Sequence, residues 1–155
     1  MPELALYEPD IAGNTGTLMR LAACTATVLN VIGPTGFRVD DTALRRAGMD
    51  YIEIAATRRH LGWNDFRQWQ MREQRRLLLV TTRGDLPYWR HEYRPGDILL
   101  LGRESAGVPP SVHEAACARL LIPMAAGARS LNVAIAGAIV LGEALRQTGG
   151  WRETR

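Results

Sequence analysis

The chain has 155 residues, a length that fits one domain with its own hydrophobic core. Its formal net charge is +3, and all 19 basic side chains are arginines. The sequence does not begin with a basic segment followed by an apolar one, which argues against a secretory signal. Its most apolar stretch, 131–145, is shorter than the roughly 20 residues that cross a bilayer. We therefore expect a single domain over residues 1–155, in the cytoplasm and outside the membrane.

Apolar runs alternate along the chain with stretches of helical periodicity. The runs are short and continuous in Leu, Ile and Val, as in parallel strands that are covered on both faces. We predict strands at 4–8, 28–32, 52–56, 77–82, 97–102 and 119–124. We predict helices at Thr15–Ala26, Asp41–Gly48, Trp63–Gln74, Pro110–Ala118 and Ser130–Gln147. This alternation predicts an α/β fold with a mostly parallel sheet flanked by helices.

The loops after the strands hold the most unusual residues of the sequence. Open parallel sheets bind ligands beyond the carboxyl ends of their strands. We therefore expect a ligand site at the loops that follow Glu8, Thr82, Leu101 and Pro123. The segment 83–85 is most simply a turn.

Cysteine and histidine spacing gives no support for a metal site. Cys24 and Cys117 lie far apart in apolar segments, and we expect both to be small core residues. His60, His91 and His113 show neither HxxxH nor HExxH spacing. We interpret all three histidines as surface or loop residues.

Common catalytic and nucleotide-binding signatures are missing. The sequence has no GxGxxG after a strand and no GxxxxGK[ST], which argues against a dinucleotide-dependent oxidoreductase and a P-loop enzyme. Ser105 is not flanked as in the GxSxG motif of serine hydrolases. These classes of enzyme are therefore disfavoured.

Arginines gather in three clusters in the first half of the chain, at 45–46, at 58–59 beside His60, and at 72 with 75–76. Guanidinium groups bind phosphate and stack on bases, so the clusters are compatible with RNA binding. A solvated helix face would explain any one cluster. Codon bias in a GC-rich genome would explain the absence of lysine. Composition leaves these interpretations open.

Three loop motifs then occur in a fixed order. They are Asn14–Arg20 after a strand ending in Tyr-Glu-Pro, Leu101–Pro109, and Ile122–Met124 followed by Ser130–Val133. Together with the segments 36–37 and 44–51 they resemble the SPOUT methyltransferases, and among them the TrmL type, over nearly the whole chain. The resemblance implies a C-terminal deep trefoil knot that forms the cofactor pocket. Knots are very rare, so periodicity alone predicts a plain doubly wound sheet.

The resemblance also implies a reaction and its partners. Members of the TrmL-type subgroup transfer a methyl group from S-adenosyl-L-methionine to the ribose 2′-hydroxyl of the tRNA wobble nucleotide, cytidine or modified uridine. The tRNA would be bound at its anticodon stem-loop, by a homodimer joined through the C-terminal helix, and no metal is implied. The alternatives are another tRNA or rRNA ribose as target, or a non-catalytic RNA-binding module with the same fold.

The family pattern assigns a cofactor slot, apolar and edged by backbone hydrogen-bonding groups. The matching residues are Val80, Thr81, Leu101, Gly102, Glu104, Gly107, Ile122, Met124, Ser130, Leu131 and Asn132. The two glycines would allow close approach of the backbone. Without the resemblance, the apolar members would be strand core and the glycines turn residues.

Five residues are expected at the reacting centre by the same resemblance: Arg20, Asn14, Glu104, Ser130 and Asn132. Arg20 would orient the ribose or its phosphate and stabilise developing negative charge, since a guanidinium stays protonated. Its alternative is a surface arginine paired with a carboxylate. Glu104 would hold Arg20 or accept a proton through water. Asn14 and Ser130 are also good helix caps, and Asn14 can bond Glu104.

The last predicted helix is apolar on most sides. Its apolar arc contains Leu131, Ile135, Ala138, Ile139 and Leu145, and its small residues Ala134, Gly137 and Gly142 would permit close packing. Such a helix is buried against its own sheet or against a second copy of the chain. Gly142 departs from the family, whose members often have an aromatic residue before the glutamate that follows.

Overall fold

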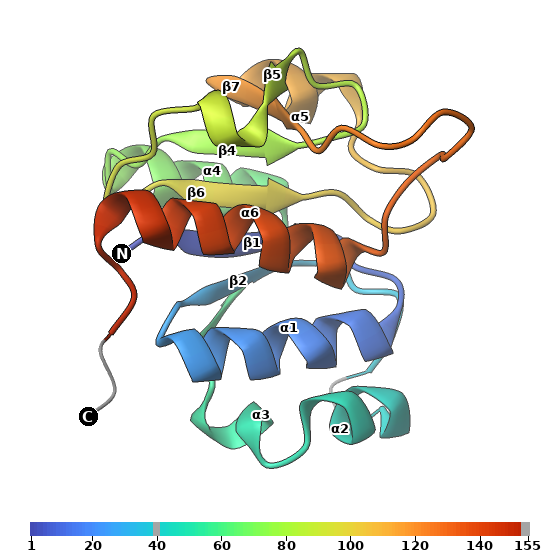
Figure 1. Ribbon diagram of the computed structural model, residues 1–155. Helices are drawn as coiled ribbons and strands as arrows, with labels where there is room; N and C mark the ends of the chain where they lie inside the picture. Colours follow the sequence, from blue (N-terminus) through green and yellow to red (C-terminus); the bar gives the residue numbers. More distant parts are fainter. Residues whose placement is uncertain (39–40, 153–155) are drawn as a thin grey trace.

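The computed structural model describes residues 1–38 and 41–152 (Figure 1). Its strands are β1 (Glu3–Tyr7), β2 (Leu29–Ile32), β3 (Thr57–His60), β4 (Leu77–Val80), β5 (Leu86–Pro87), β6 (Ile98–Leu101) and β7 (Ala118–Leu121). Its helices are α1 (Ala12–Thr25), α2 (Thr42–Gly48), α3 (Tyr51–Ile54), α4 (Trp63–Arg72), α5 (Pro110–Ala115) and α6 (Val133–Thr148), with a 3-10 turn η1 (Tyr88–Arg90). The expected domain range 1–155 includes residues 39–40 and 153–155, which lie outside the described residues.

Within the described residues, seven strands form one sheet in the order β3-β2-β1-β6-β4-β7-β5. Every neighbouring pair of strands in it is parallel. The chain therefore builds one half of the sheet outwards from β1 to β3 and then crosses over to build the other half. The predicted α/β fold with a mostly parallel, helix-flanked sheet is confirmed.

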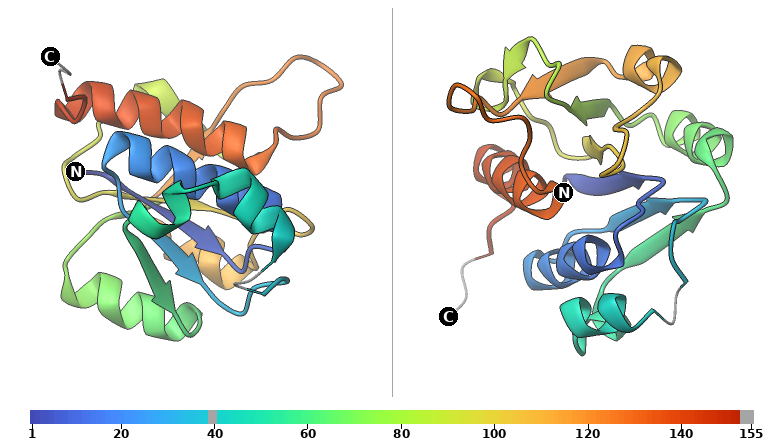
Figure 2. Two further views of the ribbon diagram at one scale, coloured as in Figure 1. Left: turned by 90° about the horizontal axis from the view of Figure 1, so that it is seen from below. Right: turned by 90° about the vertical axis from the view of Figure 1, so that its right-hand side faces the viewer.

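Helices cover both faces of the sheet. Figure 2 shows α1 and α6 on one face, with α2 and α3 packed outside α1, and α4 and α5 on the other. Successive side chains of a strand point to opposite faces. Accordingly Leu4 and Leu6 belong to the core under α1 and α6, while Ala5 and Tyr7 belong to the core under α4 and α5. Both cores include side chains of β4 and β6, the strands whose ends line the candidate site.

Helix α6 packs closely on the sheet and on α1. A Cβ atom at Gly137 would lie 2.9 Å from side-chain atoms of both Leu101 and Leu18, so the predicted close approach at this glycine is confirmed. At Gly142 the nearest atom, in Trp151, would be 4.0 Å away. The close packing predicted for Gly142 is therefore not made among residues 1–38 and 41–152 of the single chain.

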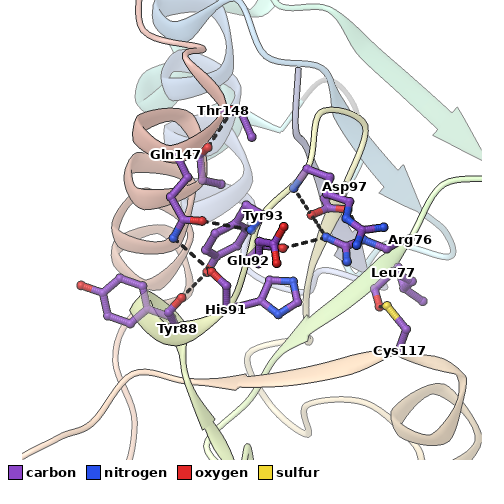
Figure 3. A network of polar contacts seen from close by, with 12 residues as sticks. Arg76, Leu77, Tyr88, His91, Glu92, Tyr93, Asp97, Cys117, Gln147 and Thr148 are labelled. Carbon is purple, nitrogen blue, oxygen red and sulfur yellow. Dashed lines mark hydrogen bonds and ion pairs between the residues drawn. The ribbon is translucent and has the colours of Figure 1, made fainter.

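The carboxyl-terminal end of α6 is fastened by Gln147, which points at the segment after η1 (Figure 3). The Gln147 side chain accepts the backbone N–H of Tyr93 at 3.0 Å. It donates to the carbonyl of His91 at 3.0 Å and to a carboxylate oxygen of Glu143 at 2.7 Å. The Tyr93 hydroxyl in turn donates to the carbonyl of Tyr88 at 2.7 Å. One side chain thus ties the last helix to the loop that precedes β6.

Two of the three arginine clusters contribute to ion pairs at the amino ends of the strands. The buried carboxylate of Glu3 pairs with Arg75 at 2.6 Å and with Arg58 at 3.0 Å. Asp97, also buried, pairs with Arg76 at 2.7 Å. Removing one partner of a buried pair leaves an uncompensated charge, so these arginines are explained by the fold. The cluster on α2 is exposed.

The strand predicted at 52–56 is wrong. Residues 51–54 form α3, and the strand that follows is the polar run 57–60. Within the described part of the chain, β3 lies at the edge of the sheet beside β2, so it carries partly exposed polar side chains that a buried parallel strand would not. The strand was predicted on the apolar residues 52–56, which precede β3.

The burial predicted for both cysteines is wrong, and so is the surface or loop position predicted for His60. Cys24 and Cys117 are exposed. Cys24 lies off the buried face of α1, and Cys117 lies in the short link between α5 and β7. His60 is only 7% exposed, because it ends β3 under α4, where its Nε2 lies 3.0 Å from the Oδ1 of Asn30.

Candidate functional site

A cavity of about 420 Å³ lies at the carboxyl ends of β4, β6 and β7. It lies at the edge of the sheet where Figure 1 shows the loops after β6 and β7. The lining residues are Ile11, Asn14, Leu79, Val80, Thr81, Thr82, Leu101, Gly102, Arg103, Glu104, Gly107, Val108, Ile122, Met124, Ser130, Leu131, Asn132, Val133 and Ala136. Every residue expected to bind the cofactor is among them. The structure thus brings these residues together, and their role in binding stays a prediction.

The walls of the cavity are apolar and its rim is polar. Val80 and Leu101 end two neighbouring central strands, and Ile122 directly follows β7, so strand geometry places all three at one edge. Around them stand hydroxyl, amide and carboxyl groups, including those of Thr81 and Ser130. Pockets of this composition bind organic molecules with a few polar groups, and their volumes run from about 300 to 1,000 Å³.

Three of the residues expected at the reacting centre form a chain of hydrogen bonds along the rim. The Asn132 side-chain amide donates to the Oδ1 of Asn14 at 2.9 Å. Asn14 in turn donates to a carboxylate oxygen of Glu104 at 3.3 Å. These residues come from the cap position of α6, from α1 and from the loop after β6, so three distant segments meet at one point. The predicted contact between Asn14 and Glu104 is confirmed.

Both predicted helix caps are wrong. The cap position of α1 is Ile11, so Asn14 lies inside the first turn and its side chain is left to face the cavity. Helix α6 is capped by Asn132, whose Oδ1 accepts the backbone N–H groups of Ala134 at 2.8 Å and Ile135 at 3.3 Å. Ser130 therefore stands before the helix, on the rim, where its hydroxyl is not used as a cap.

The loop after β6 folds back on itself and needs glycine at both ends. Arg103 and Gly107 exchange backbone hydrogen bonds at 3.1 and 2.8 Å. Gly107 has φ +65°, and a Cβ atom at Gly102 would lie 2.8 Å from the Cα of Gly107. The predicted close backbone approach is thus confirmed, and it is an approach of the loop to itself. This turn presents Glu104 to the cavity.

Sequence reasoning missed Asp10, which faces Glu104 from the loop after β1. The backbone N–H of Asp10 donates to Glu104 at 3.0 Å, and Asp10 accepts the backbone N–H of Glu104 at 3.2 Å. Its hydrogen bonds with Glu104 and Ser105 lower the pKa of Asp10 to about 2. Burial, followed by the contact with Asp10, raises the pKa of Glu104. The only signal in the sequence was an acidic residue in the loop after the first strand.

Arg20 stands apart from the cavity lining. Its side chain is exposed on α1, with the guanidinium carbon 5.3 Å from the ring centre of Tyr51 and Nη1 3.4 Å from the sulfur of Met49. Within the described chain, Glu104 bonds to Asp10 and Asn14, so the predicted contact between Arg20 and Glu104 is not formed. Arg20 contacts an aromatic ring and a sulfur atom, and not a carboxylate as in the alternative interpretation of a paired surface arginine.

The structure adds two findings on metals and membranes. Across residues 1–38 and 41–152, His, Cys, Asp and Glu side chains do not gather in any group of three suited to hold a metal ion. Helices in the same residues are all too short or too polar to span a bilayer.

A parallel sheet with a cavity at its carboxyl edge, ringed by residues of the three loop motifs, is typical of α/β proteins that bind a small organic molecule. Comparison with protein families gives the particular group. The chain belongs to the SpoU rRNA Methylase family, whose model matches residues 1–142.

Individual relatives cover nearly the same span. The tRNA (cytidine(34)-2′-O)-methyltransferase of Ancylobacter novellus is 56% identical over 151 residues, which are 97% of this chain and 96% of that protein. A solved structure described as giving structural insights into the 2-OH methylation of C/U34 on tRNA matches with a TM-score of 0.90 and 37% identity, covering 95% of each chain. The AdoMet-bound rRNA methyltransferase of Sinorhizobium meliloti matches with a TM-score of 0.86 and 31% identity, over 94% of this chain and 56% of that one.

Proposed function

We propose that this protein transfers a methyl group from S-adenosyl-L-methionine to the ribose 2′-hydroxyl of the wobble nucleotide of tRNA, a cytidine or a modified uridine. One observation carries the proposal: the residues assigned to the cofactor by the family pattern, with Asn14, surround a single cavity. The relatives named for methylation of nucleotide 34 support the target. As an enzyme of tRNA modification, the protein would act in the cytoplasm.

The residues present fit S-adenosylmethionine. The cavity has apolar walls for the adenosine and the thioether chain, and polar groups at the rim for the ends of the methionine part. Its volume of about 420 Å³ suits a ligand of that size. The related structure with bound AdoMet supports the same cofactor. We propose no metal, since the bound cofactor itself supplies the activated methyl group.

The chain's own residues would act mainly by positioning. In-line displacement requires the ribose oxygen to be aimed at the methyl carbon and relieved of its proton. Asn14, Glu104 and Asn132, linked by hydrogen bonds on the rim, would fix the place of the ribose. Arg20 would orient the ribose or its phosphate and stabilise negative charge that develops on the oxygen. Ser130, free of a capping role, would complete the rim with a hydroxyl.

We also propose that two copies build the complete site through α6. The outer face of this helix is apolar and exposed: Ile135 is 53% exposed, and Leu131 before the helix is 39% exposed. Ile11, 50% exposed at the start of α1, extends the same apolar character beside the cavity. In a dimer on this face, the RNA would meet Arg20 of one copy and the cofactor held by the same or by the other copy. Ile135→Arg is expected to give monomers in sedimentation velocity and to abolish methyl transfer.

The trefoil knot of the family is proposed for the C-terminal part of the chain. Strand β7 lies beyond β4, whereas α6 returns to pack on β6 and α1, so the segment 122–132 must cross back over the carboxyl edge of the sheet. Figure 1 shows this long connection after β7. In the knot, that return would pass through the loop made by an earlier segment.

The test is transfer of labelled methyl from S-adenosylmethionine to bulk tRNA, followed by nuclease digestion to locate the label. Label on a wobble 2′-O-methyl nucleotide supports both class and target. Label at another ribose of tRNA or rRNA retains the class and changes the target. With label on neither RNA, and with RNA still bound, the non-catalytic binding module becomes the function to test.

A further inference from the structure

Asp10 lies in the loop between β1 and α1, opposite a loop that comes 94 residues later in the chain. Gly36 packs against Asp10 and fixes its place. The backbone N–H of Gly36 donates to the carbonyl of Pro9 at 2.9 Å. A Cβ atom at Gly36 would lie 2.9 Å from both the Cα and the Cβ of Asp10. Asp10 is therefore held between the turn at Gly36 and the loop after β6.

Three consecutive residues of the opposite loop contact the Asp10 side chain. One carboxylate oxygen accepts the backbone N–H of Glu104 at 3.2 Å. The other accepts the hydroxyl of Ser105 and lies 3.5 Å from Nη2 of Arg103. The Asp10 backbone N–H donates to the Glu104 carboxylate at 3.0 Å. The Asp10 side chain is 18% exposed, whereas its contact with Ser105 lies at the surface.

These contacts hold Glu104 at two points. Its backbone is tied to the Asp10 carboxylate, and its side chain is tied to the Asp10 N–H on one oxygen and to Asn14 on the other. The turn that carries Glu104 closes on itself at Gly102 and Gly107. The residues between these glycines therefore need a contact outside the turn to fix their position. Asp10 provides that contact.

We propose that Asp10 is a positioning residue, which holds the Glu104 carboxyl group and its turn in the place that cofactor binding and methyl transfer require. This inference rests on the proposed function, of which it names a further component. The anionic Asp10 also has a second effect. It opposes ionisation of Glu104, so Glu104 is the member of the pair that takes up a proton first as the pH falls.

The test compares Asp10→Ala, Asp10→Asn and, as a matched control, Asp85→Ala, which removes an exposed carboxylate from the turn after β4. For Asp10→Ala we expect the Kd for S-adenosylmethionine, measured by calorimetry, to rise about tenfold. We expect kcat for tRNA methylation at saturating cofactor to fall more than tenfold, with KM for tRNA within threefold of the wild-type value. Asp85→Ala is expected to match the wild type in all three quantities.

Asp10→Asn separates positioning from a merely structural role. Its amide preserves the shape and removes the charge, so cofactor affinity is expected to stay within threefold of wild type. The pH midpoint of cofactor binding that disappears in Glu104→Gln is expected to move to lower pH in Asp10→Asn. If that midpoint does not move, or if Asp10→Ala remains within twofold of Asp85→Ala in Kd and kcat, Asp10 has no positioning role.

The proposed function fails separately. If wild-type protein binds S-adenosylmethionine and transfers no methyl group to RNA, the reaction is wrong, and the calorimetric and pH arms still decide on Asp10. Circular dichroism and the urea midpoint of each variant show whether a lost affinity comes from unfolding. If Asp10→Ala binds weakly because it is unfolded, the folded Asp10→Asn variant decides, and an unmoved pH midpoint in that variant overturns the proposal.

Discussion

Gln147→Ala tests whether one side chain fastens the last helix to the loop before β6 (Figure 3). The substitution removes the acceptor of the Tyr93 N–H and the donor to the His91 carbonyl. Tyr93 is 5% exposed, so its N–H would lose its partner in a place that water hardly reaches. A buried polar group left unpaired costs about 1–3 kcal/mol. The carbonyl, which is half-buried, falls at the lower end of that range.

Together the two orphaned groups predict a loss of about 2–4 kcal/mol in the free energy of unfolding. For a chain of this length that corresponds to a fall in Tm of roughly 5–15 °C. The assay is equilibrium urea unfolding at fixed protein concentration, supported by calorimetry. Gln68→Ala makes the same chemical change at an exposed site on α4 and is expected to cost less than about 0.5 kcal/mol. A Gln147→Ala variant as stable as Gln68→Ala would refute the reasoning.

Three further predictions concern the site and the core. Arg20→Ala is expected to abolish methyl transfer to tRNA while cofactor affinity stays within a few-fold, because Arg20 is exposed and outside the cavity lining. Retained turnover would remove Arg20 from the mechanism. Gly102→Ala places a Cβ atom 2.8 Å from the Gly107 backbone, so calorimetry should show a cofactor affinity at least tenfold lower. The control is Gly13→Ala, whose Cβ atom meets nothing within 4 Å and which should bind the cofactor normally. Burial lowers the pKa of His60 below 6.5, so the unfolded chain takes up that proton first. The contribution of His60 is therefore complete above pH 6.5 and is lost as the pH falls below it, and urea unfolding of His60→Gln should show a weaker pH dependence in this range.

The sequence was informative wherever burial dictated composition. Strands β4 and β6 are central and covered on both faces, so their Leu-rich runs were assigned correctly. The polar edge strand β3 gave no such signal, because its side chains are selected by contacts with Glu3, Asn30 and α4 rather than by a core. The two-residue strand β5 is too short to have any periodicity.

Some features of the candidate site could likewise be predicted from the sequence, and others could not. Its lining could be listed in advance, since strand ends and a recognisable order of motifs fix which residues share one edge of the sheet. The caps could not, because the amide of Asn14 and the hydroxyl of Ser130 suit either a helix terminus or a cavity, and only the helix boundaries decide between them. Asp10 was not predicted as a site residue because its contact is with Glu104, 94 residues later, and a local sequence pattern does not show such a contact.

The cavity draws its walls from the start, the middle and the end of the chain, from Ile11 to Ala136. Under the proposed function, a nascent chain on the ribosome would have no place to hold the methyl donor until α6 has docked. A ligand that binds only the finished fold stabilises it in proportion to its supply, by about 1.4 kcal/mol at ten times its Kd. Cellular levels of the donor would thus govern how long each enzyme molecule survives as well as how fast it turns over, and starvation for methionine should shorten its lifetime.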